Sequence, residues 1–269
     1  MITYVRKPIP DIGIDESAKR LTPEKIEKTI NAVLKGTGAR LKAYLETCIH
    51  CALCSEACHY YLSHDKDPSY SPVAKVKMTL WEMVEKKGKV SADFIRQCSR
   101  IAYTECNRCR RCSLYCPYGI DIWYLMALVR RICLLLKVVP QYEMDTNYSH
   151  AATLNMMWLK QDDWIDTVQW QEEEVRMEYP TARIPFDKEG AEIMYTPIAP
   201  EPKFKPQLLA ATAKIFHAAG VDWTMPSSDG WDNSDISMHV ADFETMARVE
   251  RKHFEAAVRL KVKRIVMCE

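Results

Sequence analysis

The sequence carries almost no net charge, and its N-terminal region lacks a long apolar segment. Its 37 basic and 36 acidic residues leave a formal charge of +1. This charge balance gives no reason to expect binding to nucleic acid or to anionic lipid. The first 30 residues include no apolar segment of the kind found in signal peptides. We therefore expect a chain that is not exported and that has no nucleic-acid partner.

The sequence also lacks a segment that could span a membrane. Its most apolar stretch, residues 120–140, is interrupted by Arg130, Arg131 and Lys137. The longest uncharged run is well below the ~20 residues that cross a bilayer, and a central arginine costs about 2.5–3.5 kcal/mol on the insertion scale. We expect residues 122–136 to form a helix that is buried or, because it is so apolar, covered by other subunits.

Cysteine, by contrast, is plentiful, with 11 residues in the chain. In a chain that is not exported, these thiols lie in a reducing compartment, where structural disulfides are rare. Two stretches, residues 48–58 and 106–116, share the spacing C-x2-C-x2-C-x3-C, and a proline follows the second. Two such runs almost never arise by chance in one chain. The pattern therefore indicates metal binding.

The spacing favours iron–sulfur clusters over zinc. Structural zinc sites commonly use two C-x2-C pairs that are separated by a dozen or more residues. The two runs instead match the pattern of two-cluster ferredoxins, in which the fourth cysteine of a run binds the other cluster. We predict two [4Fe–4S] clusters, one held by Cys48, Cys51, Cys54 and Cys116 and the other by Cys106, Cys109, Cys112 and Cys58. A zinc-stabilised interaction module is the alternative if no cluster forms.

Other residues near the runs have simpler interpretations. Because each run already supplies four thiolates, we interpret His50 and His59 as hydrogen-bond donors or surface residues rather than ligands. Cys98 and Cys133 occupy apolar helical positions and are assigned to the core. Three arginines that interleave the second run could offset cluster charge, dock an acidic partner or form a solvated basic loop: Arg108, Arg110 and Arg111.

The segments around the two runs are predicted to be helical. Thr22, Ser71, Ser91 and Asp121 each stand where a side-chain oxygen can cap the start of a helix. Proline follows the first two of them, at the position that a helix start favours. The sequence thus predicts a helical scaffold around two clusters rather than the hairpins of a compact ferredoxin.

The C-terminal part has a different character. Residues 140–190 are acidic and rich in tryptophan (Trp158, Trp164 and Trp170), and we interpret them as an arm that packs on a neighbouring surface. From residue 191 three strand-like segments, AEIMYTP, VDWTMP and RIVMCE, alternate with helical ones, which predicts a parallel sheet. We therefore expect an α+β chain with four parts: an N-terminal extension (1–40), a helical dicluster ferredoxin domain (41–139), a connecting arm (140–190) and a partial parallel α/β domain (191–269).

These features resemble a known family. The paired cysteine runs in a helical setting, followed by EPKFKPQLLAATAKIFHAAGVDWTMPSSDGWD, are similar to iron–sulfur subunits related to heterodisulfide reductase. The nearest resemblance is to subunits of the membrane-bound redox complexes of sulfate reducers, of the Tmc, Hmc and Dsr type. It covers nearly the whole chain and is weakest over residues 1–40 and 140–190.

The resemblance implies an electron-transfer subunit for anaerobic respiration with sulfate reduction. Such a subunit lies in the cytoplasm, on the inner face of the cell membrane. It is bound in a hetero-oligomer to a membrane cytochrome b-type or quinone-reactive subunit. It passes electrons between that subunit and a cytoplasmic acceptor. Other redox subunits, such as a multihaem cytochrome c, are further partners that the resemblance implies.

The resemblance also raises the question of catalysis. Members of the family carry CCG motifs that hold a catalytic cluster for disulfide chemistry, and residues 191–269 resemble the start of such a domain. This sequence contains no Cys-Cys-Gly, and only Cys268 lies near the expected place. Three explanations are open: a fragment, a lost site, or a reading frame cut at a selenocysteine codon. The alternative function is therefore a thiol–disulfide reductase whose active cluster lies at or beyond Cys268.

Overall fold

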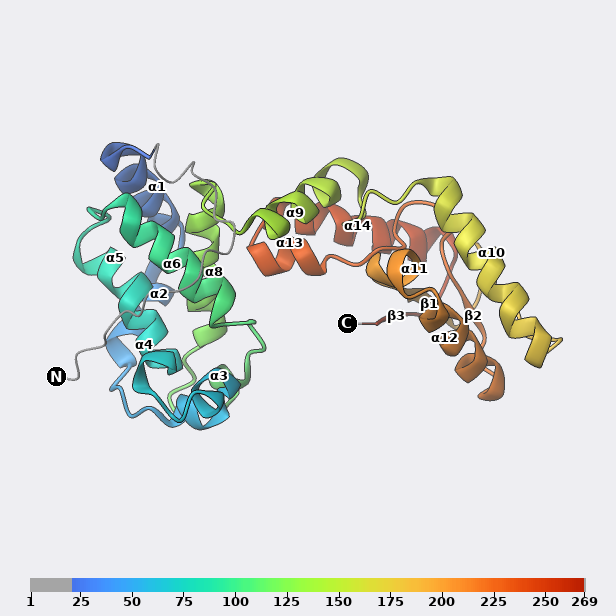
Figure 1. Ribbon diagram of the computed structural model, residues 1–269, viewed down its shortest axis with the longest axis horizontal. Coiled ribbons are helices and arrows are strands. Elements are labelled where there is room, and N and C mark those ends of the chain that lie inside the picture. The colour runs from blue at the N-terminus through green and yellow to red at the C-terminus, as the bar shows by residue number, and fades with distance from the viewer. Residues whose placement is uncertain (1–20, 269) are drawn as a thin grey trace. The chain divides into compact units, whose positions relative to one another are not determined.

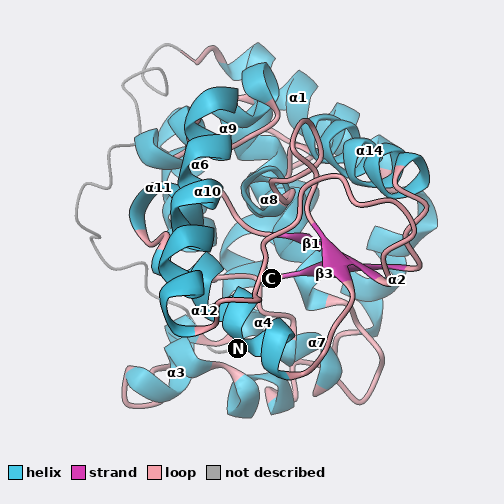
Figure 2. Cartoon of the chain, turned by 90° about the vertical axis from the view of Figure 1, so that its right-hand side faces the viewer, coloured by secondary structure: helices cyan, strands magenta, loops and turns pink. Residues whose placement is uncertain are grey.

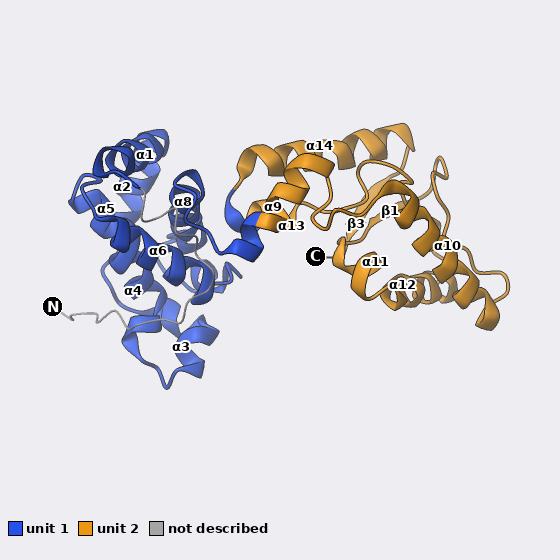
Figure 3. Cartoon of the chain, turned by 45° about the horizontal axis from the view of Figure 1, so that its top comes forward, with its two compact units in different colours: residues 1–144, 239–241 blue, residues 145–238, 242–269 orange. Residues whose placement is uncertain are grey.

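The computed structural model describes residues 21–268, which form two compact units (Figure 3). Unit 1 comprises the chain up to Met144 together with His239–Ala241, and unit 2 comprises Asp145–Met238 and the chain from Asp242 onward. Residues 1–20 of the expected N-terminal extension, and Glu269 at the end of the expected third strand, lie outside the described residues.

Unit 1 is built from helices and short helical turns (Figure 1). Its elements are α1 (Pro23–Gly36), α2 (Gly38–Thr47), η2 (Leu53–Ala57), α3 (His59–Ser63), η3 (Pro68–Tyr70), α4 (Pro72–Val76), η4 (Lys77–Trp81), α5 (Glu82–Glu85), α6 (Ala92–Thr104), α7 (Arg111–Leu114) and α8 (Ile122–Leu135). Helix α9 (Gln141–Thr153) begins in unit 1 and continues into unit 2. The predicted helical character of this region is confirmed.

Four helices of unit 1 start where the sequence predicts. In each case the side chain of the capping residue accepts a hydrogen bond from the backbone N–H three residues further on, at 3.1–3.4 Å. These caps are Thr22, Ser71, Ser91 and Asp121. Proline occupies the first turn of α1 and of α4, where its missing N–H leaves no intrahelical bond unmade. Local sequence alone therefore determines these boundaries.

Helix α8 lies in the core of unit 1. It packs against α6, α1, α4 and η4, and nine of its 14 residues are buried. Leu135, near its end, is its one strongly exposed large apolar side chain among the described residues. The apolar surface of this helix is therefore covered by its own unit. The expectation that other subunits cover residues 122–136 is wrong, and the alternative, a buried helix, is correct.

The assignment of two cysteines of unit 1 to the core is confirmed. The side chains of Cys98 in α6 and Cys133 in α8 are fully buried, as expected for core cysteines. Burial raises the pKa of Cys133 to about 12, so this thiol stays protonated and inert. Within residues 21–268, no helix is both long enough and apolar enough to cross a membrane.

Unit 2 contains a small parallel sheet, drawn in magenta in Figure 2. Its strands are β1 (Ile193–Thr196), β2 (Trp223–Thr224) and β3 (Arg264–Met267), in the order β2-β1-β3, with Ile193 opposite both Trp223 and Arg264. Its helices include α10 (Gln161–Glu178), α11 (Pro200–Phe204), α12 (Gln207–Ala218) and α14 (Phe243–Arg259), while α13 (Asp235–Val240) crosses the division between the units. The predicted three parallel strands are confirmed.

The tryptophan-rich segment contributes to the core of unit 2. Helix α10 packs against α12. Trp164 is fully buried and stacks on Trp231 with a centroid separation of 4.4 Å. Trp158 and Trp170 remain more than half exposed. The surface on which this predicted arm packs therefore belongs to the same chain.

Candidate iron–sulfur sites

The two cysteine runs adopt the same unusual backbone. In each run the second and fourth residues after the first cysteine have positive φ angles of 57–64°, although none of them is glycine. These residues are His50 and Ala52 in the first run and Arg108 and Arg110 in the second. Left-handed conformation costs roughly 1–2 kcal/mol for such residues, and strain of this kind gathers at functional sites. Turns of this type make backbone concavities that bind anions, including iron–sulfur centres.

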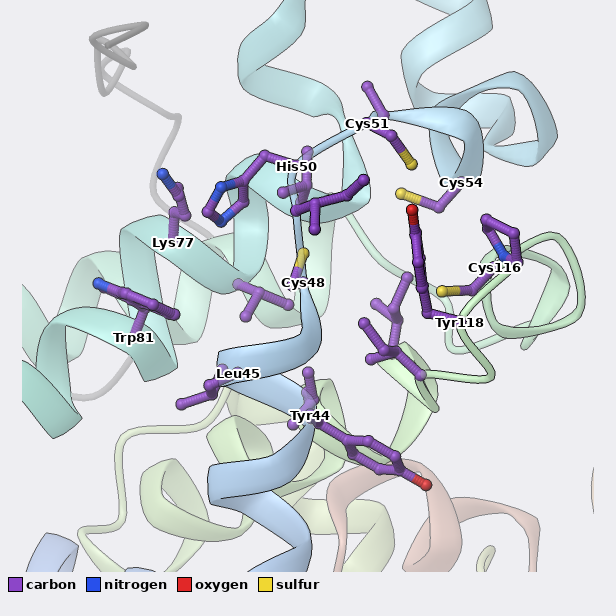
Figure 4. Close-up of a pocket in the computed structure, with 18 residues that line it drawn as sticks. Tyr44, Leu45, Cys48, His50, Cys51, Cys54, Lys77, Trp81, Cys116 and Tyr118 are labelled. Atoms are coloured by element: carbon purple, nitrogen blue, oxygen red, sulfur yellow. The ribbon is translucent and has the colours of Figure 1, made fainter.

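The first cavity brings together four thiols from both runs. Cys48 lies at the end of α2, Cys54 lies in η2, and Cys116 follows α7. Together with Cys51, they line one cavity and their sulfur atoms point into it (Figure 4). The rest of the wall is mainly apolar, with Leu45, Ile49, Val73, Val76, Pro117, Ile120, Ile122 and Leu125. The structure therefore brings three cysteines of the first run together with the last of the second.

The second cavity has the complementary set of thiols. Cys58 ends the first run, yet it lines this cavity together with Cys106, Cys109 and Cys112. Its wall has more charged side chains than that of the first cavity, where Lys77 is the charged residue in the wall. The charged side chains of the second cavity are Lys75, Glu105, Arg108 and Arg110. All eight cysteines that the sequence selects are thus divided between two cavities, four to each.

The donor atoms suit a cluster that bridges several thiolates. The thiols line the walls of cavities, and across residues 21–268 no group of three or more His, Cys, Asp or Glu side chains is placed to hold a single ion. Burial raises the pKa of Cys54 to about 11 and that of Cys112 to about 12. Such thiols become thiolates only when a metal replaces the proton, as in iron–sulfur ligation. The residues present therefore fit [4Fe–4S] clusters.

The sequence did not reveal two buried cations, of which one lines the second cavity and the other lies beside it. Lys75 in α4 is 2% exposed, and its Nζ lies 3.7 Å from Cys58 Sγ. Arg130 in α8 is fully buried, and its guanidinium donates to the backbone carbonyls of Ala102, Cys106 and His239. In both cases the sequence shows a charged residue inside an apolar helical segment, which can indicate a buried charge. For Arg130 we used this pattern only as an argument against a membrane-spanning segment.

The arginines of the second run have separate environments. Arg108 is buried, donates to the carbonyl of His239 at 3.1 Å and stacks over the ring of Trp123 at 4.2 Å. Arg110 forms an ion pair with Asp121 at 3.2 Å, and Arg111 is exposed. The interpretation of all three as a solvated basic loop is therefore wrong for Arg108, which is held inside unit 1.

The two histidines lie at the margins of the cavities. His50 is exposed, lines the first cavity and meets the edge of Trp81 at a centroid distance of 6.0 Å. His59 lines the second cavity and packs on Tyr60. Burial lowers the pKa of both rings, aided by Lys77 at His50 and by Lys75 at His59. Both positions are consistent with rings that adjoin the sites without joining the four thiols.

Cys268 in unit 2 stands apart from these sites. It follows β3, is partly exposed, and its sulfur accepts a hydrogen bond from Asn233 Nδ2 at 3.9 Å. It is the only cysteine after Cys133 in the sequence. One cysteine does not define a cluster site, so the alternative of a catalytic cluster here gains no support from its surroundings.

Comparison with known proteins identifies the class of the cluster-bearing region. Residues 44–120, which contain all eight cysteines of the two runs, match the 4Fe-4S dicluster domain family. A 4Fe-4S dicluster domain is therefore present. This match covers a minority of the chain. No solved structure matches the chain.

Curated relatives define the resemblance more narrowly. The chain is 28% identical over 145 residues to the Hdr-like menaquinol oxidoreductase iron-sulfur subunit 2 of Archaeoglobus fulgidus. This match covers 48% of this chain and 25% of that relative. It is also 28% identical over 138 residues to the Hdr-like menaquinol oxidoreductase iron-sulfur subunit of Archaeoglobus profundus, and this match covers 45% of this chain and 24% of that relative. The matches thus span about a quarter of the length of these relatives. They confirm the predicted resemblance to an Hdr-like iron–sulfur subunit.

Proposed function

We propose that this chain is an electron-transfer iron–sulfur subunit of a membrane-associated respiratory redox complex. It holds one [4Fe–4S] cluster with Cys48, Cys51, Cys54 and Cys116, and a second with Cys58, Cys106, Cys109 and Cys112. The observation that carries this proposal is the division of the eight thiols between two cavities, each of which takes three from one run and one from the other. When bound, the clusters supply one-electron chemistry.

The packing of unit 1 suits a relay between the two sites. Element η2, in the first cysteine run, packs against α7, in the second run, so the two runs are in direct contact. Cys51 and Cys109 are exposed, which leaves each site one side that a redox partner can approach. The chain therefore binds and insulates the two clusters while it keeps both accessible for electron exchange.

The relatives suggest the two ends of this relay. Their names assign them to menaquinol oxidoreductases. We infer that this chain exchanges electrons with a membrane cytochrome b-type or quinone-reactive subunit on one side and a cytoplasmic acceptor on the other. It would then lie on the inner face of the cell membrane within a hetero-oligomer that includes further redox subunits, such as a multihaem cytochrome c.

The cluster assignment makes a direct analytical prediction. Protein prepared without oxygen is expected to be brown, to bleach with dithionite and to contain about eight irons per chain, because each site takes a four-iron cluster. Iron and sulfide analysis, together with absorption spectra before and after reduction, provides the measurement. A colourless protein that contains two zinc ions would refute the proposal.

A second prediction concerns the partners. Five apolar side chains close to the ligand cysteines are 47–79% exposed: Ile49, Leu53, Leu114, Tyr115 and Tyr118. Exposed apolar surface of this kind usually marks a contact site. We expect the chain to co-purify with membranes in detergent as part of a hetero-oligomer, and the double variant Ile49→Ser, Leu114→Ser to lose most of this association.

A matched control separates this contact from general surface apolarity. Ile215 in α12 of unit 2 is 65% exposed, and Ile215→Ser is expected to leave the association with membranes unchanged. Size-exclusion chromatography of the chain expressed alone provides the complementary measurement. A stable monomer with both clusters intact, and with no binding to washed membranes, would argue against an obligate subunit of a membrane complex.

A further inference from the structure

The two cavities differ in the positive charge that faces the thiols. In the second cavity the Nζ atom of Lys75 lies 3.7 Å from Cys58 Sγ, donates to the carbonyl of Glu105 and lies 4.8 Å from the centre of the Tyr60 ring. In the first cavity the lining ammonium group is that of Lys77, whose Nζ lies 6.0 Å from the Trp81 ring and whose residue is partly exposed. The first cavity thus has a weaker, solvent-screened cation.

The sequence fixes the position of Lys75. Ser71 caps α4 and Pro72 starts it, and every residue of α4 is buried. Lys75 therefore has no route to solvent, and the described residues place no carboxylate in an ion pair with it. A buried ammonium is costly unless an anion compensates it. The sulfur of Cys58 becomes such an anionic group when it binds the proposed cluster, and Lys75 contacts it directly. The Glu105 carboxyl also interacts electrostatically with Lys75.

The other charged side chains around the second cavity also make the electrostatic field there more positive on balance. Arg108 is buried and lines this cavity, and Arg130, which is also buried, donates to the carbonyl of Cys106 beside it. Glu105 contributes an opposing carboxyl group to the wall of this cavity. Arg110 is compensated by Asp121. The net field at the second cavity is therefore more positive than at the first.

On the basis of the proposed function, we propose that Lys75 tunes the second cluster site to the higher reduction potential of the two. Reduction adds one electron and hence one negative charge to the site, so a fixed buried cation stabilises the reduced form more than the oxidised one. The effect is large because charges interact more strongly away from water. Charge and hydrogen bonds to cluster sulfur atoms are established determinants of such potentials.

The test is a redox titration of the intact chain, prepared without oxygen, with dithionite as the electron donor and low-temperature EPR as the readout. Lys75→Met keeps most of the side-chain length and removes the charge. It is expected to reduce the equilibrium constant for reduction at the second cluster at least tenfold, which is 59 mV for one electron, without moving the first. Lys75→Arg is expected to restore most of the shift, and Lys77→Met to move the first cluster by less.

The outcomes separate this inference from the proposed function. Wild-type protein without iron would refute the proposed function. Lys75→Met protein with about eight irons and unmoved potentials would overturn only the role of Lys75, as would an equally large effect of Lys77→Met. If the Lys75→Met variant loses the second cluster, the inference is tested instead by the order in which the two clusters of the wild-type protein are reduced. The cluster altered by Cys58→Ser must be the one reduced first, and the reverse order would overturn the inference.

Discussion

Replacement of Cys58 by alanine is expected to disrupt the cluster bound by Cys106, Cys109 and Cys112 and to spare the one nearer in sequence. Cys58 follows Cys54 by only four positions, yet the two thiols line different cavities. The reason is the geometry of η2 (Leu53–Ala57), since Cys54 lies inside this turn and Cys58 lies beyond its end. The expected iron content is about half that of the wild type, because one of two four-iron clusters is lost.

Paired variants distinguish crossed from adjacent ligation. With crossed ligation, Cys58→Ala and Cys106→Ala lose the same component of the reduced EPR spectrum, whereas Cys48→Ala and Cys116→Ala lose the other. With adjacent ligation, Cys58→Ala instead shares its loss with Cys48→Ala, and that result would refute the ligand sets proposed above. Cys133→Ala serves as the control because this buried thiol lines neither cavity, so it should retain both spectral components.

Local patterns in the sequence were sufficient for the starts of helices and for the choice of cysteines. A capping side chain acts on a backbone N–H only three residues away, so Thr22 and Ser71 reveal their roles without knowledge of the fold. The spacing of the cysteine runs is similarly local. The three short strands of unit 2 were also predictable, because they are apolar segments that alternate with helical ones.

Features that depend on packing between distant segments were not predictable. The apolar residues of α8 indicate burial but do not specify what covers them, and α6 and α1 do so here. The sequence left open whether Arg108 faces a cluster, an acidic partner or solvent. The fold places it over Trp123, 15 positions later, and against the carbonyl of His239. The role of Lys75 at the second site could not be predicted, because it depends on the fold that places Cys58 beside it.

The largest expected effect on the stability of unit 1 comes from Arg130→Met. Arg130 Nε and Nη2 donate to the Ala102 carbonyl at 3.0 and 2.7 Å, Nη1 donates to the His239 carbonyl at 2.6 Å, and Nη2 also reaches the Cys106 carbonyl. Methionine fills similar space but donates nothing. Arg108 still donates to the His239 carbonyl, so the Ala102 and Cys106 carbonyls are the ones that lose a side-chain donor. Each buried carbonyl left without a donor costs about 1–3 kcal/mol, so we expect the free energy of unfolding to fall by roughly 2 kcal/mol or more.

The adjacent arginine offers a matched control for this prediction. Arg131 is only partly buried, and its guanidinium donates to the Ala241 carbonyl at 3.2 Å, so Arg131→Met should cost about 1 kcal/mol. Circular dichroism under anaerobic conditions measures the unfolding midpoints, and cluster absorbance measures the rate of iron loss. Because Arg130 holds the carbonyl of Cys106, its variant should also lose iron faster from the second site than from the first. Equal midpoints for the two variants would mean that the buried carbonyls find other donors, and that Arg130 does not organise the loop that carries Cys106.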